Sequence, residues 1–158
     1  MTIQNETGLI PKDLMSQICE ALQVKEEELS LIVNEKSYQY LDQKGLIKEV
    51  VFSLQLNTTC IAQFTLAPLI GCCGVCISTG AVVLRNWRNK GLGKLLNLLR
   101  IHIATHLGYG LLLATSKETN EPQSKIFFAN GWEAVQQFVN PRTGNHLVVH
   151  TYVLEGGR

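Results

Sequence analysis

The segment Arg88-Asn89-Lys90-Gly91-Leu92-Gly93-Lys94 joins an uncharged, strand-like run to an amphipathic helix, so the fold must contain a strand–turn–helix unit. The strand-like run is Val75–Leu84, and the helix is predicted over Gly91–Leu107. A helix that begins in such a turn presents unpaired N–H groups and the positive end of its dipole. Gly91 and Gly93 let a ligand approach the backbone closely. With its cationic side chains, the turn predicts a pyrophosphate-binding site.

Charge is distributed unevenly along the 158 residues, although the net charge is only +1. Residues 1–49 carry nine acidic and five basic side chains, whereas residues 50–117 carry no Asp or Glu and six basic ones. A region with clustered cations and no carboxylates attracts an anionic ligand. The six basic residues of this region are Arg85, Arg88, Lys90, Lys94, Arg100 and Lys117.

Length and composition favour one cytoplasmic domain. A chain of 158 residues with 46% hydrophobic and 17% charged residues is typical of a single globular domain, expected to span 1–158. The polar N-terminus and the interrupted apolar runs do not fit a signal peptide or a membrane span. Five cysteines, an odd number, fit reduced thiols better than a disulfide framework. We therefore expect a cytoplasmic protein without a membrane partner.

Residues 1–46 form a predicted N-terminal helical region. The first helix is expected to begin at Pro11-Lys12-Asp13 and to place Leu14, Ile18, Ala21 and Leu22 on one face. A second helix is expected between Lys25 and Gln43, ended by Gly45, although Leu29–Val33 also fits a short strand.

Residues 47–155 form a predicted core of strands and helices. Alternation of apolar and polar residues begins near Ile47 and indicates strands. The order of elements indicates an α/β (mixed) fold, with a mixed central sheet flanked by helices in one domain. The expected elements are a strand ending at Leu56, a hairpin turn at Asn57-Thr58-Thr59, the strands Cys60–Ile70 and Val75–Leu84, the helix Gly91–Leu107 capped by Gly108, the strand Leu111–Thr115, a helix from Glu121-Pro122 to Asn130, and the antiparallel pair Trp132–Val139 and His146–Leu154.

Two common phosphate-binding motifs do not fit the glycine-rich turn. A P-loop needs a Ser or Thr directly after its Lys, but Leu95 holds this position after Lys94. A Rossmann fingerprint needs a third Gly at position 96 and an acidic residue about 20 residues later. Position 96 is Leu, and no acid follows before Glu118. Both motifs are therefore excluded.

The stretch Val82–Leu96 resembles the acyl-CoA-binding motif of the GNAT superfamily of N-acetyltransferases, in which a strand precedes Gln/Arg-x-x-Gly-x-Gly/Ala and a helix. Leu111–Thr115 is similar to the following strand, Asn120 to an Asn that starts the next helix, and Gly131-Trp132 to the exit of that helix. The resemblance covers residues 47–155 well. It implies a GNAT-like domain in which 47–155 bind CoA and 1–46 lie on the acceptor side.

This resemblance implies an enzyme that transfers an acetyl group from acetyl-CoA to a primary amine by direct attack in a ternary complex. Asn120 would hydrogen-bond the pantetheine, and Lys125 would face the adenosine phosphates. The strand residues Val82, Val83 and Leu84 would offer backbone groups to the pantetheine arm. The pyrophosphate would be held mainly by N–H groups of Arg88, Asn89, Lys90, Gly91, Gly93 and Lys94.

The residues that commonly move protons in this family are missing. Phe127 stands where members commonly carry a Tyr, seven positions after the Asn, that protonates the leaving thiolate. The strand before the turn lacks the Glu that many members use as a base, because residues 50–117 contain no acid. Ser124, one helical turn before Phe127, is the nearest substitute donor.

Other functions stay open at this point. The missing Tyr and Glu favour a catalytically silent CoA-binding module as the main alternative, and the basic region 85–100 leaves a nucleic-acid-directed acyltransferase as a lesser one. The acceptor amine is small or macromolecular, and a homodimer is not excluded. No metal is expected, because the Cys and His residues lack the spacing of a zinc site. These residues are Cys72, Cys73, Cys76, His146 and His150.

Overall fold

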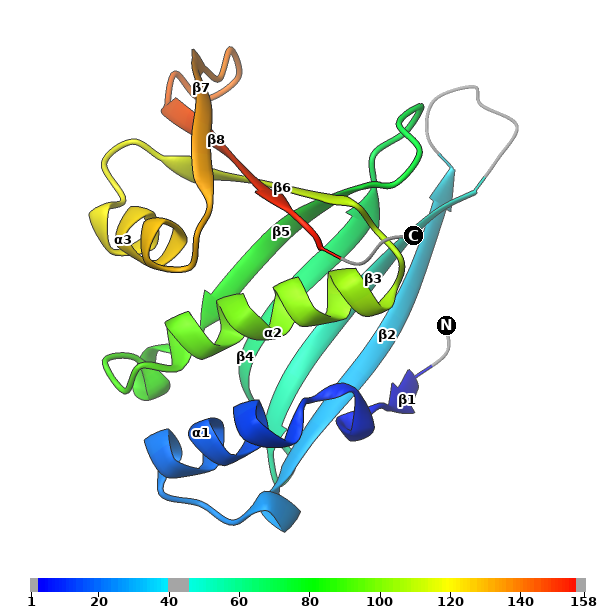
Figure 1. Ribbon diagram of the computed structural model, residues 1–158, viewed down its shortest axis with the longest axis vertical. Helices are drawn as coiled ribbons and strands as arrows, with labels where there is room; N and C mark the ends of the chain where they lie inside the picture. Colours follow the sequence, from blue (N-terminus) through cyan, green and yellow to red (C-terminus); the bar gives the residue numbers. More distant parts are fainter. Residues whose placement is uncertain (1–2, 40–45, 156–158) are drawn as a thin grey trace.

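The computed structural model describes residues 3–39 and 46–155, which form an eight-stranded sheet with three α-helices (Figure 1). The strand order is β1-β2-β3-β4-β5-β6-β8-β7, and among these strands only β5 and β6 pair in parallel. The mixed α/β fold is thereby confirmed. The elements are β1 (Ile3–Asn5), η1 (Thr7–Leu9), α1 (Lys12–Leu22), η2 (Glu26–Glu28), β2 (Leu29–Gln39), β3 (Leu46–Leu56), β4 (Thr59–Pro68), β5 (Val75–Val83), η3 (Arg85–Trp87), α2 (Leu92–His106), β6 (Leu111–Lys117), α3 (Glu121–Ala129), β7 (Glu133–Val139) and β8 (His146–Val153).

The N-terminal region contains more strand than the sequence predicted. Residues expected to form a helix between Lys25 and Gln43 form the turn η2 and then β2, and the expected helix end at Gly45 lies outside the described residues. The helix prediction is wrong and the strand alternative is right, because β2 is paired with β3 along its whole length. Pairing of this kind buries every second residue on one face of the sheet. These buried residues are Leu29, Leu31 and Val33.

The other predicted elements are confirmed, with ends shifted by a few residues. Helix α1 begins at Lys12, and the turn between β3 and β4 contains Asn57 at φ +54°. Helix α2 ends at His106, and Gly108 adopts the expected left-handed conformation with φ +81°. Strands β7 and β8 pair antiparallel.

Helices α1 and α2 lie side by side over one face of the sheet (Figure 1), and α2 also packs against β4 and β5. The predicted apolar stripe of α2 is buried, and this burial fixes the helix on the sheet. The buried residues of this stripe are Leu92, Leu95, Leu96, Leu99 and Ile103.

No α-helix among the described residues is long and apolar enough to cross a membrane.

Strands β5 and β6 separate after a short paired stretch. Pairing runs from Val75 opposite Leu111 to Ser78 opposite Ala114, and both strands continue beyond this point without pairing to each other. Beyond Ser78 the register between β4 and β5 also shifts, at Gly80, whose φ is +59°. Such a bulge bends a strand and leaves part of its backbone unpaired. The two strands therefore part beside the beginnings of α2 and α3.

Candidate functional site

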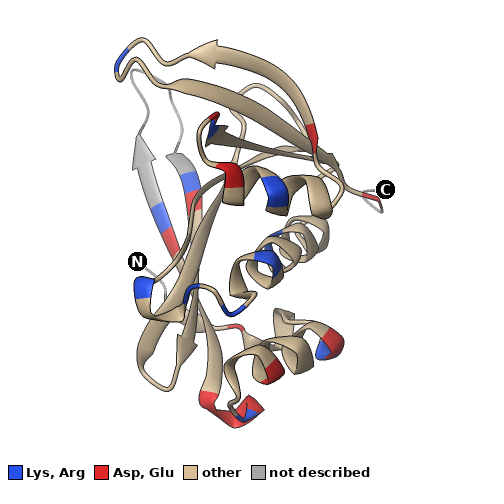
Figure 2. Ribbon diagram, turned by 90° about the vertical axis from the view of Figure 1, so that its left-hand side faces the viewer, with Lys and Arg blue, Asp and Glu red and all other residues tan. Residues whose placement is uncertain are grey.

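A groove of about 610 Å³ lies where the end of β5 meets the beginnings of α2 and α3. Basic residues occur in and around the glycine-rich turn before α2, whereas acidic residues occur on α1 and η2 (Figure 2). Its lining contains no acidic side chain among the described residues. The lining residues are Ala81, Val82, Val83, Arg88, Asn89, Gly91, Gly93, Lys94, Asn120, Pro122, Gln123 and Ile126.

The glycine-rich turn leaves the N-terminus of α2 open toward the groove. Gly91 is the N-cap at φ +78°, and no side chain caps the helix there. Asn89 is also left-handed, with φ +63°, so the chain reverses direction within three residues. Arg88 is held by a hydrogen bond of 2.9 Å in which its Nε donates to the carbonyl oxygen of Val83. The N–H groups of Leu92 and Gly93 thus remain available to an anion in the groove, whereas the N–H of Lys94 donates to the carbonyl oxygen of Gly91 at 3.1 Å.

The opposite wall of the groove is the first turn of α3. The side-chain oxygen of Asn120 accepts a hydrogen bond of 3.3 Å from the N–H of Gln123, so Asn120 caps this helix and its amide NH₂ is left to donate to a ligand. Gly93 sets the distance between the walls. A Cβ atom at Gly93 would lie 3.1 Å from Cδ1 of Ile126, closer than ordinary van der Waals contact.

The groove adjoins a cleft of about 320 Å³ between the separated strands β5 and β6. The two hollows share Ala81, Asn120 and Gln123, so they adjoin each other along these residues. The described lining of the cleft contains the cations Arg100 and Lys117 and no carboxylate. The remaining lining residues are Ser78, Thr79, Gly80, Ala114, Thr115, Ser116 and Phe127.

Arg100 is a buried cation in the wall of this cleft, with only 2% of its surface exposed. Its Nε donates to Oδ1 of Asn97 at 2.7 Å, its Nη2 donates to the same oxygen, and its Nη1 donates to Oγ of Ser78 at 3.3 Å. The guanidinium carbon lies 4.8 Å from the ring centroids of both Phe127 and Trp132. Burial lowers the pKa of Arg100 to about 9, so the side chain is still charged at neutral pH.

Phe127 is at the centre of a buried aromatic cluster. Its ring centroid lies 4.3 Å from that of His150 and 4.7 Å from that of Trp132. The hydroxyl of Ser116 lies 2.9 Å from Nε2 of His150. Burial, and secondly the charge of Arg100, lower the pKa of His150 below its ordinary value. His150 is therefore a neutral base at pH 7, in contact with a hydroxyl that lines the cleft.

The structure brings most of the predicted CoA-binding residues together around the groove. The residues that it does not bring there are Leu84, Lys90 and Lys125. Nζ of Lys90 lies 5.3 Å from the ring centroid of Trp87. Nζ of Lys125 lies 3.9 Å from Oε2 of Glu121 at the exposed surface of α3. The predicted residues that line the groove are Val82, Val83, Arg88, Asn89, Gly91, Gly93, Lys94 and Asn120.

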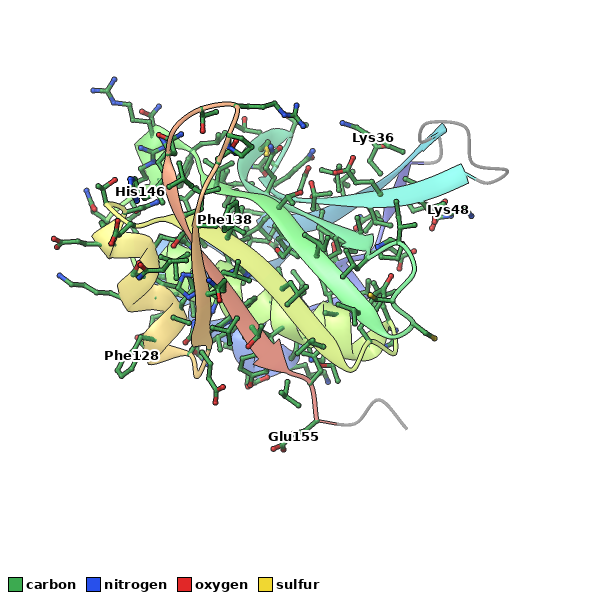
Figure 3. All side chains as sticks on the ribbon, turned by 90° about the horizontal axis from the view of Figure 1, so that it is seen from above. Lys36, Lys48, Phe128, Phe138, His146 and Glu155 are labelled. Carbon is green, nitrogen blue, oxygen red and sulfur yellow. The ribbon has the colours of Figure 1, made fainter. Side chains whose placement is uncertain are left out.

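Ser124, the predicted proton donor, lines neither the groove nor the cleft. It borders a separate hollow of about 310 Å³ together with Phe128, Trp132 and His150. Phe128, the neighbour of buried Phe127, is 85% exposed and projects from α3 (Figure 3). The role of Ser124 in catalysis stays a prediction.

The sequence alone did not assign Ser78, Ser116 or the buried Arg100 to the cleft. For Arg100 a signal existed, because it follows Leu96 by four residues and precedes Ile103 by three, which places it on the buried face of α2. Ser116 gave no signal, because its contact with His150 depends on the pairing of β6 with β8.

The cysteines do not form a metal site within the described ranges. Cys72 and Cys73 are exposed, whereas Cys76 is buried on β5, and burial raises the pKa of its thiol to about 12. Within residues 3–39 and 46–155, no three His, Cys, Asp or Glu side chains come together as metal ligands would.

No protein-family model matches the sequence, and no curated protein is significantly similar to it. Solved structures, however, share its fold. YncA from Salmonella typhimurium, assigned as an acetyltransferase and solved with its cofactor acetyl-CoA, has a TM-score of 0.58 at 17% identity. The match covers 68% of this chain and 65% of YncA, slightly less than two thirds of that protein.

Two further structures extend the comparison. A protein from Desulfovibrio desulfuricans that is assigned to the GNAT family of acetyltransferases has a TM-score of 0.60 at 10% identity, over 97% of this chain and 98% of its own. A Bacillus subtilis acetyltransferase in complex with CoA has a TM-score of 0.57 at 13% identity, over 67% of this chain and 77% of its own. The chain therefore has the fold of the GNAT acetyltransferases.

Proposed function

We propose that the chain is an acetyl-CoA-dependent N-acyltransferase that transfers an acetyl group to a primary amine. The observation that carries this proposal is the adjoining pair of hollows, one at the open N-terminus of α2 and one between the separated strands β5 and β6. The first suits a pyrophosphate, since free N–H groups and cations surround it. The second is a narrow cleft in which a thioester can be held away from water.

The residues of the site fit CoA. Gly91, Gly93 and Lys94 line the part of the groove where helix N–H groups bind phosphate oxygens. Asn120 lines both the groove and the cleft, and its amide NH₂ can donate to a ligand there. The bulge at Gly80 and Ala81 leaves strand backbone unpaired at the cleft wall, where an N–H group can polarise a carbonyl. Lys90 and Lys125 do not line the groove, so we expect them to act on the phosphates through longer-range attraction.

The reaction is attack of an amine nitrogen on the thioester carbonyl carbon. A C–N bond forms, the C–S bond breaks, and the CoA sulfur leaves as a thiolate. Holding the two reactants in one cleft supplies much of the rate, because the encounter becomes effectively unimolecular.

Ser116 and His150 offer a route for the amine proton. In the tautomer with its proton on Nδ1, His150 accepts the Ser116 hydroxyl proton at Nε2 while Ser116 Oγ accepts the proton of the amine. The lowered pKa of His150 keeps this base free at neutral pH. The pair thus supplies a base in a cleft whose described lining holds no carboxylate.

Calorimetric titration with CoA and acetyl-CoA, followed by detection of free thiol across a panel of primary amines, tests the proposal. Binding of both nucleotides together with amine-dependent thiol release is the expected result. Absence of CoA binding by the folded protein would overturn it.

The alternative is a catalytically silent CoA-binding module. Phe127 favours it, because a phenyl ring cannot donate a proton beside the thioester. Tight CoA binding without thiol release for any amine class would support this alternative.

A further inference from the structure

Arg100 is a buried charge that has no acidic partner among the described residues. Charged side chains that are fully buried are usually paired, because removing an ion from water is costly. Among the described residues, the partners of Arg100 are the neutral side chains of Asn97 and Ser78 and two aromatic rings. The ion pairs of the described chain do not include it. The cost of this burial thus has no compensation from a carboxylate of the described chain.

Hydrogen-bond donors are in excess around this charge. A guanidinium carries five N–H donors, and three of those on Arg100 are used by Asn97 and Ser78. One donor on each Nη atom therefore remains. The Nδ2 atom of Asn97 is also buried and has no hydrogen-bond partner in the described structure. Arg100 and Asn97 together therefore have N–H donors without acceptors in the described structure.

These donors lie at the inner end of the cleft. Ser78, which binds Nη1 of Arg100, is the last residue of β5 that pairs with β6, at Ala114. The strands part directly beyond it, so Arg100 marks the apex of the opening. A ligand that enters between the strands from the groove would approach Arg100 with its inner end.

We propose that the apex of the cleft binds a carboxylate of the substrate through Arg100. A carboxylate supplies acceptor oxygens for a guanidinium in a two-pronged geometry, which suits the remaining Nη donors. This inference rests on the proposed function, which places the acyl end of an acyl-CoA in the same cleft. The carboxylate belongs either to the acyl group, as in a dicarboxylic monothioester, or to the acceptor, as in an amino acid.

The acyl source is tested with matched thioesters. Succinyl-CoA and butyryl-CoA have acyl groups of similar length and differ in the terminal carboxylate. If the carboxylate belongs to the acyl group, succinyl-CoA binds the wild-type protein about 10- to 100-fold more tightly, the gain expected for a charge-assisted hydrogen bond. Calorimetry measures the two affinities. The affinity for free CoA, measured in the same way, tests the proposed function separately.

The acceptor source is tested with acetyl-CoA as donor and amino acids compared with their carboxamides. If the carboxylate belongs to the acceptor, kcat/KM for the acids exceeds that for the amides about 10- to 100-fold. Either preference supports the inference. CoA binding without a carboxylate preference in either comparison would overturn the inference and leave the proposed function intact, whereas absence of CoA binding would refute both.

Substitutions test whether Arg100 causes the preference for a carboxylate. Arg100→Met replaces the cation with an apolar side chain of similar length and is expected to abolish the preference while acetyl-CoA still binds. Arg142→Met makes the same change at an exposed position between β7 and β8 and should keep it. If Arg100→Met does not fold, Arg100→Lys, which keeps the charge but cannot form the two-pronged contact and is expected to reduce the preference, provides the second test. A full preference in either folded cleft variant would place the carboxylate elsewhere.

Discussion

Ser116 and His150 are 34 residues apart in the sequence, yet Oγ of Ser116 lies 2.9 Å from Nε2 of His150 in the interior of the protein. The pairing of β6 with β8 creates this contact, because Ala114 is opposite His150 and Ser116 follows two residues later on the same face. Ser116 lines the cleft, whereas His150 borders the separate hollow that Ser124 also borders. The hydroxyl of Ser116 therefore connects the cleft to the imidazole of His150.

Ser116→Ala is expected to lower kcat by about 10²-fold with little change in acetyl-CoA affinity, since a positioned general base contributes about 10²–10⁴-fold. Ser124→Ala, the same chemical change in the other hollow, is the matched comparison. Thiol release in single-turnover experiments measures both. A larger loss in Ser124→Ala would restore Ser124 as the proton-carrying residue and exclude Ser116.

The lowered pKa of His150 predicts that the protein becomes less stable in mild acid. Below the unfolded-state pKa of about 6.5, the unfolded chain binds a proton that folded His150 does not accept. The free energy of unfolding should therefore fall as the pH decreases from 6.5 toward 5, and His150→Gln should flatten this slope. Burial, and secondly His106, also lower the pKa of His102, which therefore contributes to the slope in the same direction. The variant His102→Gln serves as the comparison. Urea titrations at several pH values measure the slope, and an unchanged slope in His150→Gln would contradict the assignment.

Gly93→Val is expected to weaken acetyl-CoA binding by several kcal/mol, because each charge-assisted hydrogen bond to the pyrophosphate contributes about 1.5–3 kcal/mol. The new side chain would also press on Ile126, since even a Cβ lies only 3.1 Å from its Cδ1. Gly93→Val combined with Ile126→Ala separates the two effects. The second change should restore the melting temperature but not the affinity, whereas wild-type affinity in either folded protein would move the pyrophosphate away from this turn.

Arg88→Ala should weaken CoA binding only modestly and more at low salt, because backbone N–H groups are expected to provide most of the phosphate binding.

Lys125→Ala tests the contact with the adenosine phosphate separately. Lys125 is 80% exposed and 3.9 Å from Glu121, so the expected effect is small and confined to ligands with the 3′-phosphate. Titration with CoA and dephospho-CoA measures the difference. Equal losses for both ligands would remove Lys125 from the adenosine phosphate.

The sequence predicted the parts of the site that local chemistry determines. Gly91 was identified because glycine lets a ligand approach the backbone of the turn closely, and Asn120 because its place at the start of a helix resembles that of an Asn in the GNAT superfamily. The helix α2 was identifiable from its apolar period. The glycine-rich turn, the beginning of α2 and the beginning of α3 were therefore predictable from short segments of sequence.

The rest depends on contacts between distant segments. Strand β2 follows the acidic turn Glu26–Glu28, and its identity depends on pairing with β3, which no local pattern specifies. From the sequence, Arg100 was counted only as one of six cations in residues 50–117, whereas the structure places it on the buried face of α2. The contact of Ser116 with His150 depends on strand register, and a shift of one residue would turn His150 to the other face.

Phe127→Tyr tests whether the cleft lacks only a proton donor. Phe127 is 1% exposed and its ring is packed against His150, Trp132 and Arg100, so an added hydroxyl must point into the cleft to avoid an unpaired polar group. We expect the variant to fold and turnover to be unchanged or raised, by up to about 10²-fold, because the phenol can protonate the leaving thiolate. A gain should decline again near pH 10, where tyrosine loses its proton. The pH–rate profiles of both proteins measure this decline. Complete loss of turnover in a folded Phe127→Tyr protein that still binds acetyl-CoA would mean that position 127 shapes the acceptor pocket instead.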